Sequence, residues 1–330
     1  MAGEPAYRRT VLAAGGALAL AGLLAGCGRQ AAEAGSLRVA IIGKGEQDQR
    51  ILFRVAGIDP GVHAEYNYFQ SGHLVIEALD GGALDYGGMS EIPPVFAAAS
   101  PIHSFRQIAV LHGDVNNQVV LVPRNSPIAD LAGLKGRKVG YVRATTSHYF
   151  LIRMLQSVGL GWRDIVPVAL GVPEGAEAFS NGAIDAWAIY GFPIQHAIAT
   201  QGARVLKTAL GFLSGNYIIS AHVNALADPA KVELVGRYLR AVRKGYAWTA
   251  AHKDEWAAIV ARQIGVPLSY VQDQFRNASD PYTLRPVNDA AIASQQAVAD
   301  LFASEKLIPQ AVDVRPLWDN RFNSLIEEKA

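Results

Sequence analysis

The sequence predicts an α/β protein of two lobes with a ligand cleft between them. Short β-branched runs alternate with segments of helical periodicity from residue 37 onward, which is typical of sheets covered by helices. The pattern forms two α/β units, joined by two crossings near 122–124 and 210–218, and ends in a helical tail. The chain has 330 residues, half of them apolar and 18% charged, so it is long enough to form two cores.

The first unit begins with an apolar run that ends at a glycine-containing loop. Its predicted strands are 37–42, 63–69 and 83–87, and its predicted helices are 47–56, 71–79 and 92–99. Gly81 and Gly82 follow the second of these helices and end it. Pro93 and Pro94 stand in the first turn of the third helix, where a missing N–H costs nothing.

The second unit and the tail follow the same pattern. We predict strands at 117–123, 138–142, 165–170, 183–189, 205–206 and 217–221, and helices at 149–158, 175–181, 229–250, 255–264, 267–275, 287–302 and 317–328. We therefore assign 36–122 and 212–330 to the first lobe and 123–211 to the second. The cleft between lobes is the expected ligand site, because the carboxyl ends of parallel strands and the starts of helices face it.

The first 26 residues have the parts of an export signal. Arg8 and Arg9 precede an uncharged apolar run from 10 to 25. Roughly 16 apolar residues are fewer than the roughly 20 that span a bilayer, so we expect this segment to be cleaved. The two arginines suit either the twin-arginine route or an ordinary basic start.

Residues 24–27 resemble the lipobox of bacterial lipoproteins, in which the cysteine is lipidated and becomes the new N-terminus. Cys27, the single cysteine, stands at that position. We expect residues 1–26 to be a lipoprotein signal peptide and 27–35 to be a flexible tether, since 28–35 is polar and rich in glycine and alanine without periodicity.

Composition and missing motifs exclude several functions. Removal of residues 1–26 leaves equal numbers of basic and acidic residues, so we expect no nucleic acid partner, and contact with a membrane only through the lipid. One cysteine excludes an internal disulfide and a thiolate-rich zinc site. The sequence contains no Walker, GxGxxG, HExxH or GxSxG motif, and its eight histidines form no helical ligand pair. We predict no catalysis, metal or cofactor.

Small polar residues at strand-to-helix turns are the candidates for ligand binding. Thr145, Thr146 and Ser147 lie where the N–H groups of a first helical turn are unpaired and the helix dipole is positive. The arrangement repeats at Ser71 with Gly72 and again at Ser90. An oxyanion would bind at such turns, although these hydroxyls could instead only cap their helices.

Neighbouring side chains extend this candidate site. Arg143 could add a guanidinium or be solvated, and His148 could donate to an oxyanion or be structural. Glu91 could cap a helix, pair with Arg143 or a ligand amine, or hold the lobes together. Trp187 and Tyr190 end a predicted strand, so they could either enclose an apolar part of the ligand or pack in a core.

Several motifs resemble the substrate-binding lipoproteins of ABC importers for aliphatic sulfonates, nitrate and taurine. The similarity covers roughly 36–318. The matching segments are 77–79 (EAL) followed by the glycine-rich 81–88, 92–97 (IPPVFA), 134–139 (LKGRKV), 143–149 (RATTSHY), 178–179 (AF), 185–189 (DAWAI), His252 with 254–256 (DEW), 308–309 (IP) and 312–314 (VDV). Three departures stand out: residues 190–193 (YGFP) replace Trp-Asp-Pro-Tyr, Ala144 replaces a glycine, and the loop 43–47 fits poorly.

The resemblance implies a type II periplasmic-binding-protein fold and a solute-binding protein. Such a protein captures a small organic sulfonate and delivers it to a membrane permease with its ATPase, on the periplasmic side. The residues expected to face the sulfonate are Ser71, Gly72, Ser90, Thr145, Thr146, Ser147 and His148, with Trp187 beside its carbon chain. Alternatives are nitrate, taurine, a phosphonate or an aromatic sulfonate as ligand, or a desulfinase-like enzyme on the same fold.

Overall fold

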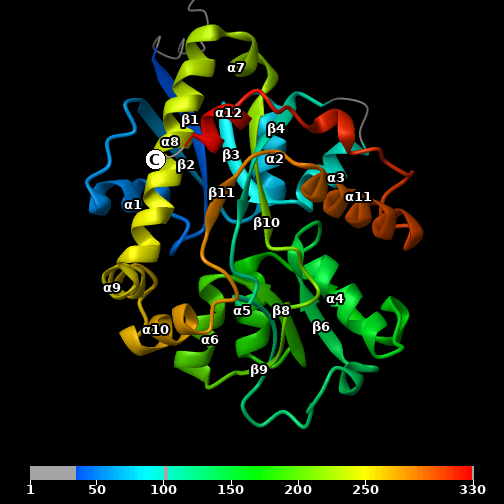
Figure 1. Ribbon diagram of the computed structural model, residues 1–330. Helices are drawn as coiled ribbons and strands as arrows, with labels where there is room; N and C mark the ends of the chain where they lie inside the picture. The colour runs from blue at the N-terminus through cyan, green and yellow to red at the C-terminus, as the bar shows by residue number, and fades with distance from the viewer. Residues whose placement is uncertain (1–34, 100–102, 329–330) are drawn as a thin grey trace, which may run out of the picture. The chain divides into compact units, whose positions relative to one another are not determined.

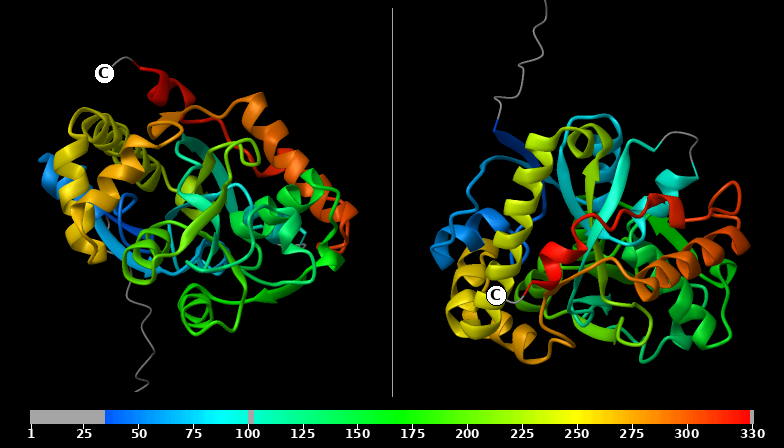
Figure 2. Two further views of the ribbon diagram at one scale, coloured as in Figure 1. Left: turned by 90° about the horizontal axis from the view of Figure 1, so that it is seen from below. Right: turned by 45° about the horizontal axis from the view of Figure 1, so that its top comes forward.

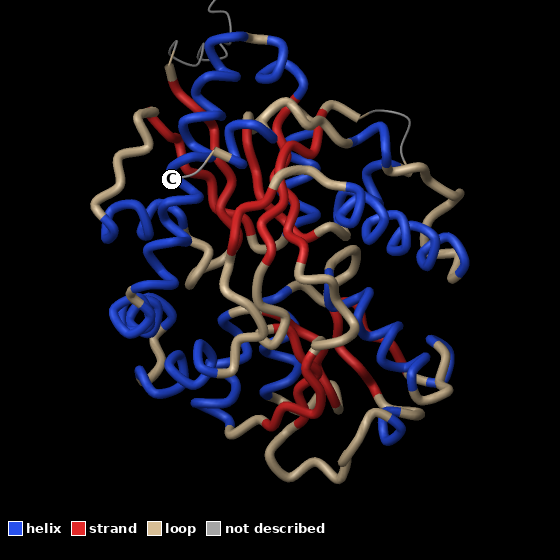
Figure 3. Tube along the Cα trace, in the orientation of Figure 1, coloured by secondary structure: helices blue, strands red, loops and turns tan. Residues whose placement is uncertain are grey.

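The computed structural model describes residues 35–99 and 103–328. Two sheets are present, one of six strands and one of five, and helices cover them. In Figure 1 the six-stranded sheet lies in the upper half and the five-stranded sheet in the lower half. Figure 3 shows the two groups of strands joined by loops. The predicted α/β fold of two lobes is confirmed. The predicted signal peptide and Cys27 lie outside the described residues, and so does all of the predicted tether except its last residue.

The six-stranded sheet has the order β11-β4-β10-β3-β1-β2. Strand β1 (Ser36–Ile42) runs parallel to β2 (His63–Phe69) and β3 (Tyr86–Ser90). Strand β10 (Asn216–His222) lies antiparallel between β3 and β4 (Phe105–His112), and β11 (Thr283–Arg285) lies at the edge. The interior strand β1 is mostly buried, while its neighbour β2 at the edge has no buried residue, as expected for a sheet covered by helices on both faces.

The five-stranded sheet has the order β7-β6-β8-β5-β9. Strand β6 (Lys138–Tyr141) runs parallel to β7 (Val166–Ala169) and β8 (Ala186–Tyr190). Strand β5 (Gln118–Val122) is completely buried and pairs antiparallel with β8 and β9 (Arg204–Thr208). Because β5 belongs to this sheet, the first crossing lies between β4 and β5, ahead of the 122–124 that we predicted. The return crossing lies between β9 and β10.

Helices pack on both faces of each sheet. Their bounds are α1 (Gln49–Ala56), α2 (Gly72–Asp80), α3 (Pro93–Ala98), α4 (Thr146–Ser157), α5 (Val172–Ser180), α6 (Phe192–Gln201), α7 (Val223–Ala227), α8 (Pro229–Ala251), α9 (Lys253–Ile264), α10 (Leu268–Arg276), α11 (Asp289–Ser304) and α12 (Asn323–Glu327). Figures 1 and 2 show α8, α9 and α10 on one side of the molecule and α11 on the other.

Some elements differ from the sequence prediction. Strands β4 and β11 and helix α6 were not predicted, and the last helix is shorter than the predicted 317–328. Strand β4 contains Gln107, which is fully buried, and its side-chain amide is satisfied by Gln295 of α11 (Nε2 donates to Oε1, 2.8 Å). Helix α6 has Pro193 in its first turn, where a proline starts a helix rather than breaking it.

The glycine at 175 is required by the core of the second lobe. A Cβ at Gly175 of α5 would lie 2.7 Å from Nε1 of Trp187 in β8. Trp187 is 1% exposed and packs with Phe179 at a ring centroid distance of 5.8 Å. The small residue therefore allows α5 to approach the sheet closely enough to bury this ring.

A buried carboxylate joins helix α8 to the first sheet. Asp85 Oδ1 accepts from Nη2 of Arg38 (2.8 Å), and Oδ2 accepts from Nζ of Lys231 (2.8 Å). The Asp85 side chain is only 4% exposed. Burial alone would raise the pKa of Asp85, but the hydrogen bonds from Arg38 and Lys231 outweigh it and hold the pKa below its usual value.

We predict that Asp85→Asn lowers the free energy of unfolding by about 3 kcal/mol at pH 7, because it leaves two basic side chains without their buried partner. Since the folded pKa is depressed, this contribution is fully present above about pH 4 and is lost as the pH falls through the folded value. Urea unfolding at several pH values measures it. Asp313→Asn, in an exposed pair with Arg315, is the control and should cause no measurable loss. Equal stability of both variants at pH 7 would contradict the prediction.

Candidate functional site

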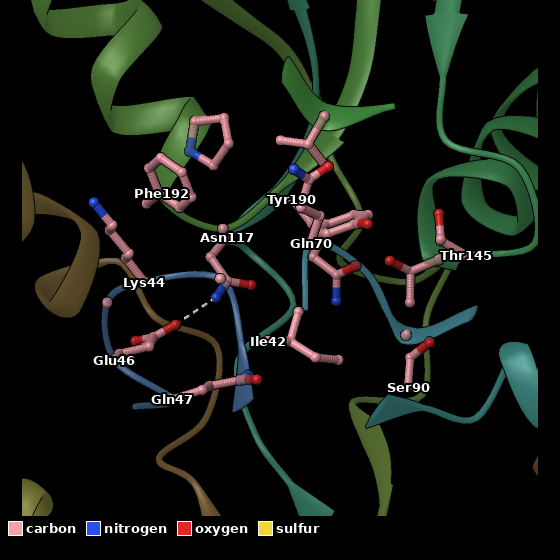
Figure 4. Close-up of a pocket in the computed structure, with 18 of the residues that line it drawn as sticks. Ile42, Lys44, Glu46, Gln47, Gln70, Ser90, Asn117, Thr145, Tyr190 and Phe192 are labelled. Carbon is pink, nitrogen blue, oxygen red and sulfur yellow. Dashed lines mark hydrogen bonds between the residues drawn. The ribbon is translucent and has the colours of Figure 1, made fainter. Parts of the chain in front are cut away.

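A cavity lies between the two sheets, where strands end and helices begin. It is lined from the first lobe by the ends of β1 and β3 and from the second by the start of β5 and the end of β8. Figure 4 shows its wall. The lining residues are Ile42, Gly43, Lys44, Gly45, Glu46, Gln47, Gln70, Gly72, Met89, Ser90, Pro93, Asn117, Gln118, Thr145, Thr146, Val172, Tyr190, Gly191, Phe192, Pro193, Tyr217, Val260, Ile264 and Gln274.

Four helices of nine or more residues begin at this cavity. Gly72 of α2, Thr146 of α4, Val172 of α5 and Phe192 of α6 are the first helical residues, and all four line it. No side chain of the N-cap residues of these helices accepts a hydrogen bond from the first turn. The first N–H groups of each helix have no partner within the helix. The cavity is therefore rich in backbone donors and in positive helix-dipole potential, which suits an anion.

Gly72 lets the start of α2 approach the neighbouring helix α3. A Cβ at this position would lie 2.9 Å from Cγ of Pro93 and 3.0 Å from Cβ of Met89. The preceding residue, Ser71, is buried and directs its hydroxyl to Nδ1 of His73 (2.9 Å). Of this predicted pair, Gly72 reaches the cavity wall, whereas the Ser71 side chain does not.

The turn before α4 is held by two of the three predicted hydroxyls. Thr145 Oγ1 donates to the carbonyl of Val142 (2.7 Å), and Ser147 Oγ accepts from the N–H of Val142 (3.0 Å). Ala144 has a φ of +57°, in the region that favours glycine, which is the residue the resemblance places there. Helix α4 begins three residues earlier than predicted, so these hydroxyls belong to its first turn and cap.

Thr146 is the hydroxyl that remains free for a ligand. Its side chain lines the cavity, is 7% exposed, and makes no hydrogen bond to any described residue. Thr145 also lines the cavity, but its proton is already donated to Val142, and Ser147 is fully buried behind the wall. The predicted trio therefore divides into one free hydroxyl and two that hold the turn.

Ser90 and Tyr190 lie where the sequence predicted them, at the ends of β3 and β8, and both line the cavity (Figure 4). The Tyr190 hydroxyl is buried and has no hydrogen-bond partner among the described residues. Burial raises the pKa of Tyr190, so it stays protonated and available as a donor or acceptor. Trp187, three residues earlier in β8, packs inside the second lobe and does not line the cavity.

Two more predicted residues lie away from the cavity wall. Arg143 is exposed and makes no ion pair among the described residues. His148 is 2% exposed and packs among the rings of Tyr141, Trp162 and Phe302, at centroid distances of 4.8, 5.1 and 5.3 Å. Because α4 starts earlier than predicted, the His148 side chain falls on the helix face that meets these rings rather than on the cavity side.

Glu91 holds the return crossing to α11. Its Oε1 accepts from the hydroxyls of Ser214 (2.6 Å) and Ser294 (3.1 Å), and its carbonyl accepts from Nε2 of Gln295 (3.0 Å). It neither caps a helix nor pairs with Arg143. Burial raises the pKa of Glu91 to about 7, and the serine hydrogen bonds only partly oppose this. Its hydrogen bonds join the return crossing to α11 within the first lobe, which is none of the roles considered for this residue.

Sequence reasoning missed an entire side of the cavity. Lys44, Glu46 and Gln47 come from the loop after β1, Asn117 and Gln118 from the start of β5, and Phe192 from α6. The loop 43–47 follows the carboxyl end of a predicted parallel strand. Because ligands bind at such ends, this position could have identified the loop as part of the site. Asn117 could not be identified in this way, because we predicted the first crossing between the lobes at 122–124, after β5. The structure has this crossing before β5, so that Asn117 lies at the cavity.

No metal site or membrane span is found in the part of the chain that the structure describes. Residues 35–99 and 103–328 contain no group of three or more histidine, aspartate or glutamate side chains placed to hold a metal ion. Among the same residues, no helix has the length and apolar character that crossing a bilayer requires.

Comparison with known proteins places this chain in a family. The NMT1/THI5-like family model matches residues 58–256. A protein of Escherichia coli (strain K12), named as an aliphatic sulfonates-binding protein, is 33% identical over 252 residues, covering 76% of this chain and 77% of that protein.

Solved structures agree with this match. The alkanesulfonate-binding protein of Xanthomonas axonopodis pv. citri, bound to MOPS, is 27% identical with a TM-score of 0.76, covering 88% of this chain and 99% of that one. The periplasmic aliphatic sulphonate binding protein of Escherichia coli is 30% identical with a TM-score of 0.73, covering 88% and 98%.

The buried histidine makes the stability of this protein depend on pH. Burial, reinforced by the charge of Arg143, lowers the pKa of His148 to about 4. The unfolded chain therefore binds a proton that the folded protein does not between about pH 6.5 and 4, so stability is lost as the pH falls through this window. We predict that His148→Phe removes a pH-dependent loss on the order of 2 kcal/mol between pH 7 and pH 5. Urea unfolding at pH 7 and pH 5 measures it.

His63→Phe, which removes an exposed histidine of β2, is the control for the substitution itself. The pKa values of Glu91 and Glu46 are raised, so these two carboxyl groups make the protein more stable as the pH falls, opposite to the effect of His148. Both glutamates are present in all three proteins and do not affect the comparison. A pH dependence that is identical in His148→Phe and the unsubstituted protein would contradict the assignment.

Proposed function

This chain belongs to the NMT1/THI5-like family, which includes the aliphatic sulfonates-binding proteins, and from that premise we propose that it is the solute-binding component of a sulfonate ABC importer. It captures a small organic sulfonate, an aliphatic one, in the cavity between its lobes and delivers it to a permease driven by an ATPase. It catalyses no reaction. The protein acts on the periplasmic side of the membrane, anchored through a lipid on Cys27 after signal-peptide cleavage.

The main observation in support of an anionic ligand is the start of two helices at the cavity. Helices α2 and α4 begin there without side-chain caps, and the free hydroxyl of Thr146 lies at the start of α4. A sulfonate presents three oxygens that share one negative charge. Those oxygens accept from backbone N–H groups and a hydroxyl at once, and hydrogen bonds to an ionised acceptor are stronger than neutral ones.

Ligand binding favours the closed arrangement of the lobes. Helix α2 belongs to the first lobe and α4 to the second, so an anion held by both starts links the lobes across the cavity. Two crossings connect the sheets, between β4 and β5 and between β9 and β10, and they are the expected hinge. A permease that contacts both lobes then recognises the loaded state, which is a shift in population and not a reaction.

Other oxyanions are the second candidate, because N–H groups and hydroxyls recognise oxygen atoms of any anion. Nitrate, taurine, a phosphonate and an aromatic sulfonate are the alternatives to test. A thermal-shift screen over this panel ranks them, since a tight ligand raises the unfolding midpoint. A desulfinase-like enzyme on this fold is disfavoured, because the sequence has no cysteine after Cys27 that could act as a nucleophile in the cavity.

We predict that Thr146→Val weakens binding of an alkanesulfonate by about tenfold or more, because hydrogen bonds to a charged group contribute about 1.5–3 kcal/mol. Thr146→Ser should retain most of the affinity, since it keeps the hydroxyl. Thr283→Val on the exposed edge strand β11 is the matched control. Isothermal titration calorimetry with ethanesulfonate measures all three. The assignment of Thr146 fails if Thr146→Val and Thr283→Val bind this sulfonate equally well.

A further inference from the structure

We propose that Glu91 is a further positioning residue of the anion site, and that the protein takes up one proton at Glu91 when the anion binds. The proton comes from solvent, lies on Oε2 of Glu91 and is donated to Oε1 of Gln118. This inference rests on the proposed function, because it takes a sulfonate at the starts of α2 and α4 as given. It follows from a second, smaller cavity beside the first.

The smaller cavity adjoins the large one. Gln118, Thr146 and Tyr217 line both cavities. Glu91 lines the smaller one and directly follows Ser90, which lines the larger one. An anion that accepts from the Thr146 hydroxyl therefore binds next to the space into which the Glu91 carboxyl group faces.

Two buried oxygens in the smaller cavity lack donors. Glu91 is 3% exposed, and its Oε2 has no hydrogen-bond partner among the described residues. Gln118 is also 3% exposed, and its Oε1 likewise lacks a partner, while its Nε2 donates to the Tyr217 hydroxyl (3.0 Å). An ionised carboxylate has no proton to donate, so both oxygens stay unsatisfied while Glu91 is charged. Buried acceptors without donors are unfavourable.

One proton satisfies both oxygens. A protonated carboxyl group carries one O–H donor, and an amide oxygen accepts it. The other oxygen of Glu91 is already held, because Oε1 accepts from the hydroxyls of Ser214 (2.6 Å) and Ser294 (3.1 Å). The two serines keep their acceptor in either protonation state. Oε2 is therefore the oxygen that carries the proton, and Gln118 is its acceptor.

No positive side chain compensates the charge of Glu91. Among the residues that the structure describes, no lysine, arginine or histidine forms an ion pair with it. Burial raises the pKa of Glu91 to about 7, and its serine partners and the nearby Asn216 oppose this only in part. A sulfonate bound beside it adds a like charge, which raises the pKa of Glu91 further. Binding above pH 7 therefore draws a proton from solvent.

The other titratable groups around Glu91 do not account for this uptake. The charge of Glu91 acts on Tyr149 of α4, and Tyr217 of β10 lines the same small cavity. Burial raises the pKa of both tyrosines, so both stay protonated with or without a ligand. His112 of β4 contacts Asn216 (Nδ1 to Oδ1, 3.3 Å) and is present in all the variants below. Helix α11 presents only a serine and a glutamine to Glu91, and neither titrates.

Calorimetry with ethanesulfonate at pH 7, 8 and 9 tests the proposal. A sulfonate stays ionised over this range, so any proton taken up goes to the protein. We expect the unsubstituted protein to bind about tenfold more weakly at pH 9 than at pH 7, because linkage to one proton changes an affinity by up to tenfold per pH unit. Titrations in buffers of different ionisation enthalpy count the protons, and at pH 8 we expect uptake of roughly half a proton or more.

Glu91→Gln separates this role from a merely structural one, because glutamine imitates the protonated acid. Its amide nitrogen is a donor for Gln118, and its oxygen is an acceptor for the two serines. We expect Glu91→Gln to bind ethanesulfonate at pH 7 within about threefold of the unsubstituted protein, and about tenfold more tightly than it at pH 9. A residue that only joins α11 to the return crossing would give no gain in affinity at pH 9.

Glu46 provides the matched comparison. It is a second glutamate whose pKa burial raises to about 7, and it lines the large cavity. In Figure 4, however, it lies on the side of the wall away from Ser90. Glu46→Gln should therefore keep the pH dependence of binding. Glu65→Gln, exposed on β2, should leave both the affinity and its pH dependence unchanged.

Three results would overturn the inference. If ethanesulfonate binds equally well at pH 7 and pH 9, or if Glu46→Gln removes the pH dependence and Glu91→Gln keeps it, no proton is taken up at Glu91 and the proposed function stands. If ethanesulfonate does not bind the unsubstituted protein at any of these pH values, the proposed function fails and the inference fails with it. Should Glu91→Gln not fold, the proton count on Glu46→Gln decides: uptake that persists supports Glu91, and its loss contradicts the proposal.

Discussion

The backbone N–H groups in the first turn of a helix need a partner that the helix cannot provide, and this requirement organises the cavity of this protein. Helices α2 and α4 begin there without side-chain caps, one in each lobe. Water or an anion must satisfy these groups, and only a ligand between the lobes satisfies both helix starts together. In the function that we propose, capture of an anion and closure of the lobes are therefore two consequences of one arrangement.

The hydroxyls near these helix starts show how such a site is supported. Thr145 and Ser147 both bond to the backbone of Val142 and so fix the turn from which α4 begins. Thr146, between them, remains free. The resemblance to a sequence motif treats the three as equivalent, but the structure uses two of them to hold the turn and leaves the hydroxyl of the third without a hydrogen bond to a described residue. Preorganisation of this kind lowers the cost of ordering the site when the ligand binds.

Away from the helix starts, the cavity wall also carries acceptor oxygens that lack hydrogen-bond donors. The Glu46 carboxylate, fixed by Asn117 and Tyr282, has an oxygen without a donor, and the amide oxygens of Asn117 and Gln118 lack donors as well. Glu91 is also buried and has a raised pKa; its Oε1 accepts from Ser214 of the return crossing and Ser294 of α11, and its Oε2 likewise has no hydrogen-bond partner among the described residues. A carboxylate thus lines the cavity at Glu46 and joins the return crossing to α11 at Glu91. The residues around each carboxylate determine which of these two positions it has.

The sequence by itself determined the α/β class, the division into two units, most of the strands and helices, and the turns at which Gly72, Ser90, Thr146 and Tyr190 reach the cavity. These features follow from local periodicity and from residues such as glycine and proline, whose conformational preferences act within a few positions. Only the tertiary structure decided that β5 belongs to the second sheet, that His148 and Trp187 pack inward, and that Glu46, Asn117 and Phe192 share one cavity. These facts depend on which distant segments pack together and on which face of an element meets them, and a pattern of neighbouring residues does not contain that information.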